Sequence, residues 1–420
     1  MKVGIIFNLI YIFGITIVYL YLFTSNALQR TIFSLDFSVF YLAGKLISEN
    51  PLALYTDPRY ILPYRYLPFY AYFFIIPSKL PFHIAYIINN ILAVIANAIS
   101  TFVVYLCCKS YYDADWNNDR EYREDIFLFF MAPVQVVNLI LGQSSPFFLL
   151  FLLSSLFFFE NVNTKAYEIP KENYLGGIFL GLAILFKPIA LLIVPFIIPI
   201  QFKTDTWLKF SIKFKPLYER FVGLAIPLVP NLLIFFRYPK LLRDFIESNF
   251  VHVLNFHHST SITRFASKLA EWQGTPISET ILLFNLFWLF FLIAIVKYLL
   301  KGNGNDSTTV VFYHEAIFIV LFIYPDSWFL YFVFWWAFFV PMYSKFKARQ
   351  HEMGIDVISN KRNHIIFHEI PKFCMIYFSF GIILHYLLIG MDPITPILLL
   401  IFMVFYQIVS FAYLIRKKAL

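Results

Sequence analysis

The sequence predicts an all-α polytopic membrane protein, with about 12 transmembrane helices and long outer loops that carry short interfacial helices. Three observations predict this fold class: 60% of the 420 residues are hydrophobic, only 14% are charged, and the mean hydropathy is +0.71. One soluble core could not bury so much apolar surface, because single cores stop growing at about 250–300 residues. Residues 1–420 are therefore expected to form a single integral membrane domain.

Apolar runs of near-membrane length recur along the whole chain. A perpendicular helix needs about 20 residues to cross the hydrocarbon core, and several runs are shorter, so two or three of them are expected to be broken or partly re-entrant. The first run, Val3 to Phe23, exceeds the apolar core of a cleaved signal peptide and predicts an uncleaved anchor. Only the proline kink at Lys187-Pro188 separates the fifth run from the sixth. The predicted spans are 3–24, 82–107, 126–141, 146–160, 174–188, 189–202, 220–237, 280–299, 309–324, 328–343, 373–390 and 393–415.

Basic residues divide unequally between alternate loops. With the N-terminus in the cytoplasm, 22 of the 33 Lys and Arg residues fall on the inner side, which leaves 11 outside. Because short cytoplasmic loops are enriched in Lys and Arg, this division predicts a multi-pass cell-membrane protein with both termini inside. The net charge of +8 is scattered over these loops, so the partners it indicates are membrane lipids and no nucleic acid.

Two outer segments, 25–81 and 238–279, are too long to be simple connections, and they are expected to form the side that carries the functional site. The first is predicted to contain a helix from Phe37 to Ser48, followed by proline turns. The second contains an amphipathic stretch from Lys240 to Phe250 that is expected to lie in the membrane interface.

Two ionisable residues stand out, because a charge at membrane depth is costly and indicates function by default. Asp36 begins the predicted helix in SLDFSVFYLAGKLI. It is either an N-cap or a general base that faces a cavity at membrane level. Lys187 lies in LAILFKPIALLI. It either extends to the outer interface or holds a phosphate group.

Further candidate residues lie in the predicted outer turns. Gln143, in NLILGQSSPFF, belongs to a polar cluster that is either a solvated turn or a group that binds sugar hydroxyls. Arg264 is either a solvated loop charge or a ligand of a phosphate. Tyr331 belongs to an aromatic set, Trp328 to Trp336, that is either an interfacial belt or a surface for stacking on a sugar.

Signals for other chemistries are missing from the sequence. His252, His257 and His258 have a spacing that matches no zinc pattern, so no metal site is expected. There is no phosphate-binding loop ending in GK[ST], no GxSxG, no HExxH and no CxxC. No cofactor is expected, and any activated substrate must reach a membrane-embedded site.

Six short segments agree in wording and order with the motifs of one known family. They are Asp36-Phe37-Ser38-Val39-Phe40-Tyr41-Leu42-Ala43-Gly44 (D-F-x-V-Y-Y-x-A), Asn50 to Tyr55 (G-x-x-L-Y), Tyr64 to Pro68 (F-x-Y-P-P), Gly142-Gln143 (G-Q-x-N), Gly177 to Pro188 (G-x-x-x-x-L-A-x-x-x-K-P) and Tyr324 to Trp328 (S-P-x-S-W). Together they resemble glycosyltransferase family 87, which holds polyprenol-phosphate-mannose-dependent mannosyltransferases of the C-type superfamily. The departures are Asn50 for glycine, Leu67 for proline and Leu330 where the family often has histidine.

The resemblance implies a fold like that of the C-type glycosyltransferases. It also implies transfer of a hexose, most often mannose, from a polyprenyl or dolichyl phosphate donor to a lipid or glycan acceptor. Asp36 would deprotonate the acceptor hydroxyl, Lys187 would neutralise the departing phosphate, and Gln143 would orient a sugar. Tyr66, Tyr331 and Arg264 are also expected to bind the substrate. The resemblance implies no cofactor or catalytic metal.

Two other classes of function remain at this point. A transporter or flippase of a lipid-linked or amphipathic substrate would use the same cavity without chemistry. Repeated halves with helices broken at matching positions would favour it, and the sequence shows neither. A structural or scaffolding membrane protein would explain neither Lys187 nor the long outer segments.

Overall fold

The computed structural model describes residues 35–111, 125–126, 133–164, 166–204, 208–251, 261–275, 277–300, 309–324, 332–352, 369 and 371–372. The predicted spans 3–24, 373–390 and 393–415 lie outside the described residues, as do Tyr331 and the three histidines of the second outer segment.

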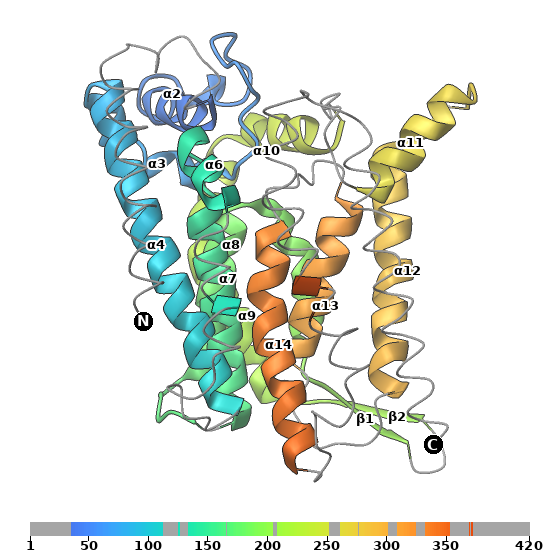
Figure 1. The fold of residues 1–420 in the computed structure, drawn as a ribbon. Coiled ribbons are helices and arrows are strands. Elements are labelled where there is room, and N and C mark those ends of the chain that lie inside the picture. The colour runs from blue at the N-terminus through green and yellow to red at the C-terminus, as the bar shows by residue number, and fades with distance from the viewer. Residues whose placement is uncertain are drawn as a thin grey trace.

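Roughly parallel helices form the body of the molecule (Figure 1). Three of the described helices are long and apolar enough to cross a membrane, α4 (Phe82–Tyr111), α9 (Phe214–Arg237) and α12 (Glu279–Leu300). Large apolar side chains such as Ile91, Leu232 and Trp288 are exposed on them, which suits contact with lipid. The body is completed by α6 (Pro133–Leu141), α7 (Ser145–Thr164), α8 (Glu172–Phe186), α13 (Thr309–Ile323) and α14 (Phe332–Glu352).

The helical architecture is thus confirmed. Among the described residues three helices are long and apolar enough to cross a membrane, where the sequence predicted about 12 spans. The predicted span 189–202 is wrong. Its residues form a 3-10 helix, η4 (Pro188–Ile197), and then the strand β1 (Ile200–Thr204), which pairs antiparallel with β2 (Leu208–Ile212). Pro195 interrupts this run, and a proline lacks the N–H that a continuous α-helix needs.

Close packing of α8 on α9 fixes the centre of the bundle. A Cβ on Gly177 would lie 2.2 Å from the carbonyl oxygen of Arg220, and a Cβ on Gly223 would lie 2.2 Å from that of Tyr174. Small residues at such crossings let two helix backbones approach, which is a common way to associate helices within lipid. Gly177, the first residue of the motif Gly177 to Pro188, is therefore explained by the packing of α8 against α9.

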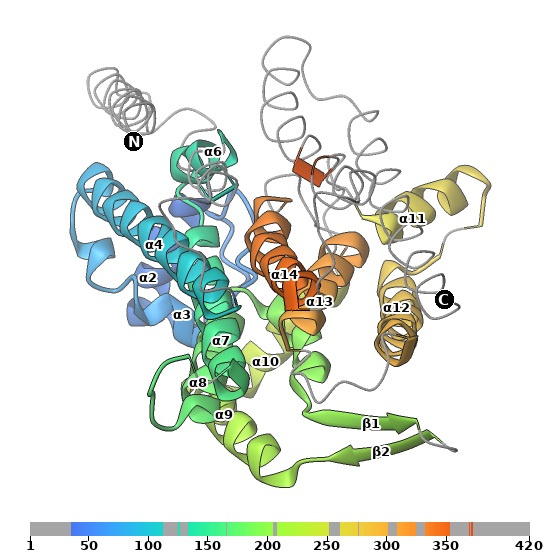
Figure 2. The same cartoon turned by 60° about the horizontal axis from the view of Figure 1, so that its bottom comes forward.

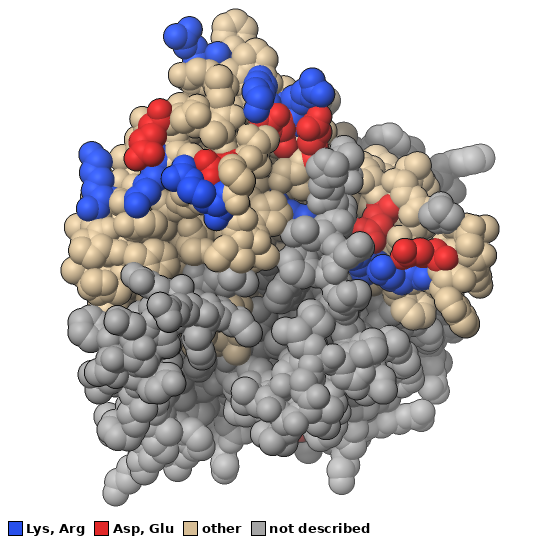
Figure 3. Space-filling view, turned by 90° about the horizontal axis from the view of Figure 1, so that it is seen from above, with Lys and Arg blue, Asp and Glu red and all other residues tan. Residues whose placement is uncertain are grey.

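Both long outer segments gather at one end of the bundle (Figure 1). Lys240 Nζ donates to the carbonyl of Leu52 at 3.2 Å, and Ser248 Oγ donates to that of Tyr64 at 3.1 Å. Viewed from this end, the described surface carries both basic and acidic side chains (Figure 3). The helix α2 (Leu35–Glu49) lies at this end and confirms the helix predicted from Phe37 to Ser48. The other described elements here are η2 (Pro51–Ala53), α3 (Pro68–Tyr72), η3 (Pro77–Lys79), α10 (Pro239–Ile246), the π-helix η5 (Glu247–Val251) and α11 (Ile262–Trp272).

Candidate active site

Three of the predicted site residues, from three separate parts of the chain, meet beneath this end. Gln143 Nε2 donates to Asp36 Oδ2 at 2.7 Å, and Lys187 Nζ donates to Gln143 Oε1 at 3.4 Å. Ser145 Oγ donates to the same amide oxygen at 3.2 Å. The amide of Gln143 thus joins the carboxylate of Asp36, 107 positions earlier in the sequence, to the ammonium group of Lys187, 44 positions later.

The position of Gln143 depends on the turn before it. Gly142 has a φ of +66°, and its amide donates to the carbonyl of Leu139 at the end of α6. A Cβ at Gly142 would lie 2.6 Å from the Cβ of Phe37. Only glycine combines this backbone conformation with so close an approach to α2. The turn therefore sets Gln143 directly beside Asp36.

Lys187 owes its position to the end of α8. Its amide closes the helix by donating to the carbonyl of Ala183 at 2.8 Å, while its own backbone is extended (φ −148°, ψ 107°). Pro188 then begins η4, so the side chain projects from a break between two helical segments. The Lys187 side chain is buried, with only 7% of the residue exposed. This burial argues against the interpretation that Lys187 extends to the outer membrane interface.

Asp36 lies in the first turn of α2, where the helix dipole favours a negative charge. Its side chain nevertheless accepts from Gln143 on another element, and it stays partly exposed beside buried neighbours. Burial raises the pKa of Asp36 from 3.8 to about 6, against the opposing effects of the Lys187 ammonium and the Gln143 hydrogen bond. This pKa suits a group that must accept a proton near neutral pH.

Aromatic rings border this group. Ser144 Oγ donates to the hydroxyl of Tyr66 at 3.4 Å, and the Tyr66 ring stacks on that of Tyr70 with centroids 4.9 Å apart. Phe40 meets Tyr66 edge-on at 5.0 Å. The structure thus brings Tyr66 to the site. It adds Tyr70, which sequence reasoning missed because tyrosines are too common here, at 28 copies, to stand out.

The segment that carries Tyr66 is anchored to the bundle by a buried amide. Asn231, in α9, accepts through Oδ1 from the backbone N–H of Phe69 at 2.8 Å, and it is 2% exposed. That bond satisfies one of the free N–H groups at the start of α3. A polar residue in an apolar span was the signal that would have identified Asn231 from sequence.

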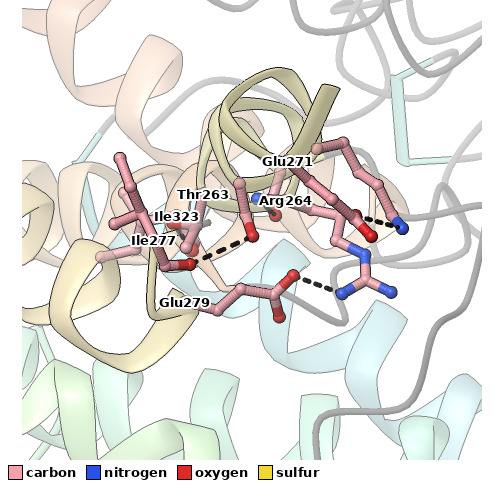
Figure 4. A network of polar contacts seen from close by, with 9 residues as sticks. Thr263, Arg264, Glu271, Ile277, Glu279 and Ile323 are labelled. Carbon is pink, nitrogen blue, oxygen red and sulfur yellow. Dashed lines mark hydrogen bonds and ion pairs between the residues drawn. The ribbon is translucent and has the colours of Figure 1, made fainter. Parts of the chain in front are cut away.

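Arg264 lies apart from these bonds. It pairs with Glu279, and both side chains are mostly buried, so the solvated-charge interpretation is wrong (Figure 4). Ser261 caps the same helix by accepting from the Arg264 N–H at 3.1 Å. Thr263 donates to the carbonyl of Ile323 at 2.5 Å, which ties α11 to the end of α13.

A second group of buried charges, toward the other end, was missed as well. Arg220, the first residue of the predicted span 220–237, donates to the carbonyl of Ile197 at 2.7 Å and to Asn173 Oδ1 at 2.9 Å. Lys345 pairs with Glu160 at 3.2 Å. These contacts join the helices α7, α8, α9 and α14. Within the described part of the chain, no three His, Cys, Asp or Glu residues are placed to hold a metal.

The family model of glycosyltransferase family 87 matches residues 64–325, more than half of the chain. The chain belongs to glycosyltransferase family 87. No curated protein and no solved structure matches it. The matched range contains Tyr66, Gln143, Lys187 and Arg264, whereas Asp36 precedes it. Membership of family 87, together with the membrane-crossing helices, makes the protein a membrane glycosyltransferase.

Proposed function

We propose that the protein transfers a hexose, with mannose as the expected sugar, from a polyprenyl or dolichyl phosphate donor to a hydroxyl of a lipid or glycan acceptor. The observation that carries the proposal is the meeting of a carboxylate, an amide and an ammonium group in Asp36, Gln143 and Lys187. A base and a cation side by side are what displacement of a phosphate by a hydroxyl requires.

The proposed step is a single displacement with inversion at the anomeric carbon. The acceptor oxygen gives its proton to Asp36 and forms a bond to that carbon on the face opposite the donor phosphate. The bond between the anomeric carbon and the phosphate oxygen breaks, and its electron pair leaves with the polyprenyl phosphate. Lys187 lies within hydrogen-bonding reach of Gln143, where its charge would stabilise the phosphate as its negative charge grows.

The remaining predicted residues are assigned by their surroundings. Gln143 holds Asp36 through its NH₂ group and would also orient the sugar. The Tyr66 ring, stacked on Tyr70, offers an aromatic edge to a sugar. Arg264 has a carboxylate partner in Glu279, so its contact with a donor phosphate stays a prediction, as does any role of Tyr331.

The decisive experiment is transfer by the purified full chain in lipid nanodiscs. Polyprenyl phosphate carrying radiolabelled mannose is supplied with a membrane lipid extract as the acceptor source, and the label that leaves the donor is counted. Transfer to an extractable product supports the proposal. Movement of intact donor across the bilayer of a proteoliposome, without loss of label from it, would instead establish the flippase alternative.

The orientation that accompanies this proposal places both termini in the cytoplasm and the two long segments outside. The support is the division of basic residues and the gathering of those segments at one end of the bundle (Figure 1). Impermeant thiol reagents applied from outside are expected to label Asp57→Cys and to spare Lys213→Cys. Equal labelling of both positions would refute this topology.

A further inference from the structure

A continuous row of aromatic rings leads away from the candidate active site. Tyr70, which stacks on Tyr66, meets the ring of Phe186 at the end of α8 edge-on, with centroids 4.9 Å apart. Phe186 in turn meets Phe151 on α7 edge-on at 5.0 Å. Ring pairs at such separations and angles attract each other. The row therefore passes through the residue that directly precedes Lys187 in the sequence.

The row continues along the seam between α7 and α8. The Phe151 ring lies 6.3 Å from that of Phe179, and Phe179 stacks on Phe158 with centroids 5.4 Å apart. Phe151 and Phe158 are two turns apart on α7, as are Phe179 and Phe186 on α8, so each pair shares one face of its helix. At 1.5 Å per residue, each pair spans about 10 Å along the helix axis. These four phenylalanines are called the aromatic strip below.

The aromatic strip stays open on one flank of the bundle, where α3, α7 and α8 lie together (Figure 2). Its four residues are half-buried, whereas Leu156 and Phe159 on the inner face of α7 are fully buried. Phe73, at the upper edge of the strip, is 49% exposed and lies 5.9 Å from Phe186. An interfacial belt does not account for this arrangement, because a belt lies at headgroup level. A strip that runs about 10 Å along the helices enters the hydrocarbon core, which is about 30 Å thick.

The occupant of the aromatic strip follows from what is bound at its upper end. In the proposed function Lys187 faces the donor phosphate, and the isoprenoid chain of the donor is bonded to that phosphate. The chain has to leave the site along an apolar surface that begins beside Lys187, and Phe186 opens such a surface. The methyl groups and double bonds of isoprene units pack well on aromatic rings, which carry large apolar faces. We propose that the aromatic strip binds the first isoprene units of the donor, an inference that rests on the proposed function.

The first test compares two mannosyl phosphate donors in nanodiscs that hold the full chain. One donor carries a polyprenyl chain, and the other carries a single isoprene unit that cannot extend along the strip. The quantity measured is the KM for the long donor relative to the KM for the short donor, because general damage to the site changes both. Phe151→Leu and Phe179→Leu each remove a ring and keep an apolar side chain. Each is expected to raise this ratio about two- to ten-fold, the factor that one aromatic contact contributes. Phe284→Leu, at a 48% exposed position on the flank of α12, is the matched control and should leave the ratio unchanged.

The second test does not depend on turnover. Polyprenyl phosphate with a photoreactive diazirine in its second isoprene unit is irradiated with the wild-type chain, and the labelled peptides are identified by mass spectrometry. Label is expected within α7 and α8, and an excess of unlabelled polyprenyl phosphate should suppress it where the same excess of phosphatidylglycerol does not. Label on other helices, equal suppression by phosphatidylglycerol, or an unchanged KM ratio in both strip variants would overturn the proposal. Label on α7 and α8 without transfer from either donor would instead refute the proposed reaction and support the lipid site.

Discussion

Replacement of Asp36 by asparagine tests the proposed base most directly. Asparagine keeps an oxygen that can accept the 2.7 Å bond from Gln143 Nε2, so the arrangement of the site should persist. A carboxamide, however, does not take a proton from a hydroxyl. With a pKa of about 6, the wild-type carboxylate is roughly nine-tenths ionised at pH 7. Nearly every wild-type molecule therefore carries the base that the substitution removes.

A general base contributes roughly 10²–10⁴-fold in rate, which is about 2.7–5.4 kcal/mol of transition-state stabilisation. Asp36→Asn is therefore expected to lower kcat by that factor in the nanodisc transfer assay. Donor crosslinking should be retained, because Lys187 and Gln143 stay in place. Glu49→Gln, which removes an exposed carboxylate from the same helix, is the matched control and should transfer at the normal rate.

Wild-type turnover by Asp36→Asn would refute the reasoning. A helix cap is about as well served by asparagine as by aspartate, so normal activity is what a purely structural role for this residue predicts. That result would exclude Asp36 as the catalytic base and would favour the hypothesis that the protein is a transporter. Loss of activity together with loss of donor crosslinking would indicate a damaged site, which a thermal unfolding measurement would reveal.

Three further predictions concern the surroundings of this carboxylate. Lys187→Met should weaken donor binding by roughly ten- to hundred-fold, since a charged hydrogen-bonding partner of the phosphate is lost, and unchanged donor crosslinking would contradict this. The raised pKa of Asp36 puts its carboxylate form above about pH 6, so kcat/KM should fall as pH drops through 6, and a rate flat down to pH 5 would exclude the base. Gly142→Ala should abolish most transfer, because the added methyl group clashes with α2 and the backbone conformation is unfavourable for alanine. Gly274→Ala is the control, since Gly274 has a similar φ of +75° but open space around it, and it should retain transfer. Equal transfer by the two variants would refute the packing argument.

Composition and local pattern determined the membrane class, the helix of the first outer segment and the identity of the candidate residues. Those properties depend on apolar content and on short-range periodicity, which a sequence displays directly. Asp36 and Lys187 were identifiable because a charge among apolar neighbours is costly wherever the chain places it. The motif order led to family 87 for the same reason, since each motif is local.

Only the tertiary structure decided which of these residues meet. Asp36 and Gln143 are 107 positions apart, and nothing local predicts that the turn at Gly142 brings them to 2.7 Å. The span predicted at 189–202 failed because hydropathy cannot distinguish a membrane helix from a 3-10 helix followed by an amphipathic strand. The solvated-charge interpretation of Arg264 failed for a similar reason: whether an arginine in a loop is solvated or buried depends on a partner, here Glu279, that packing supplies.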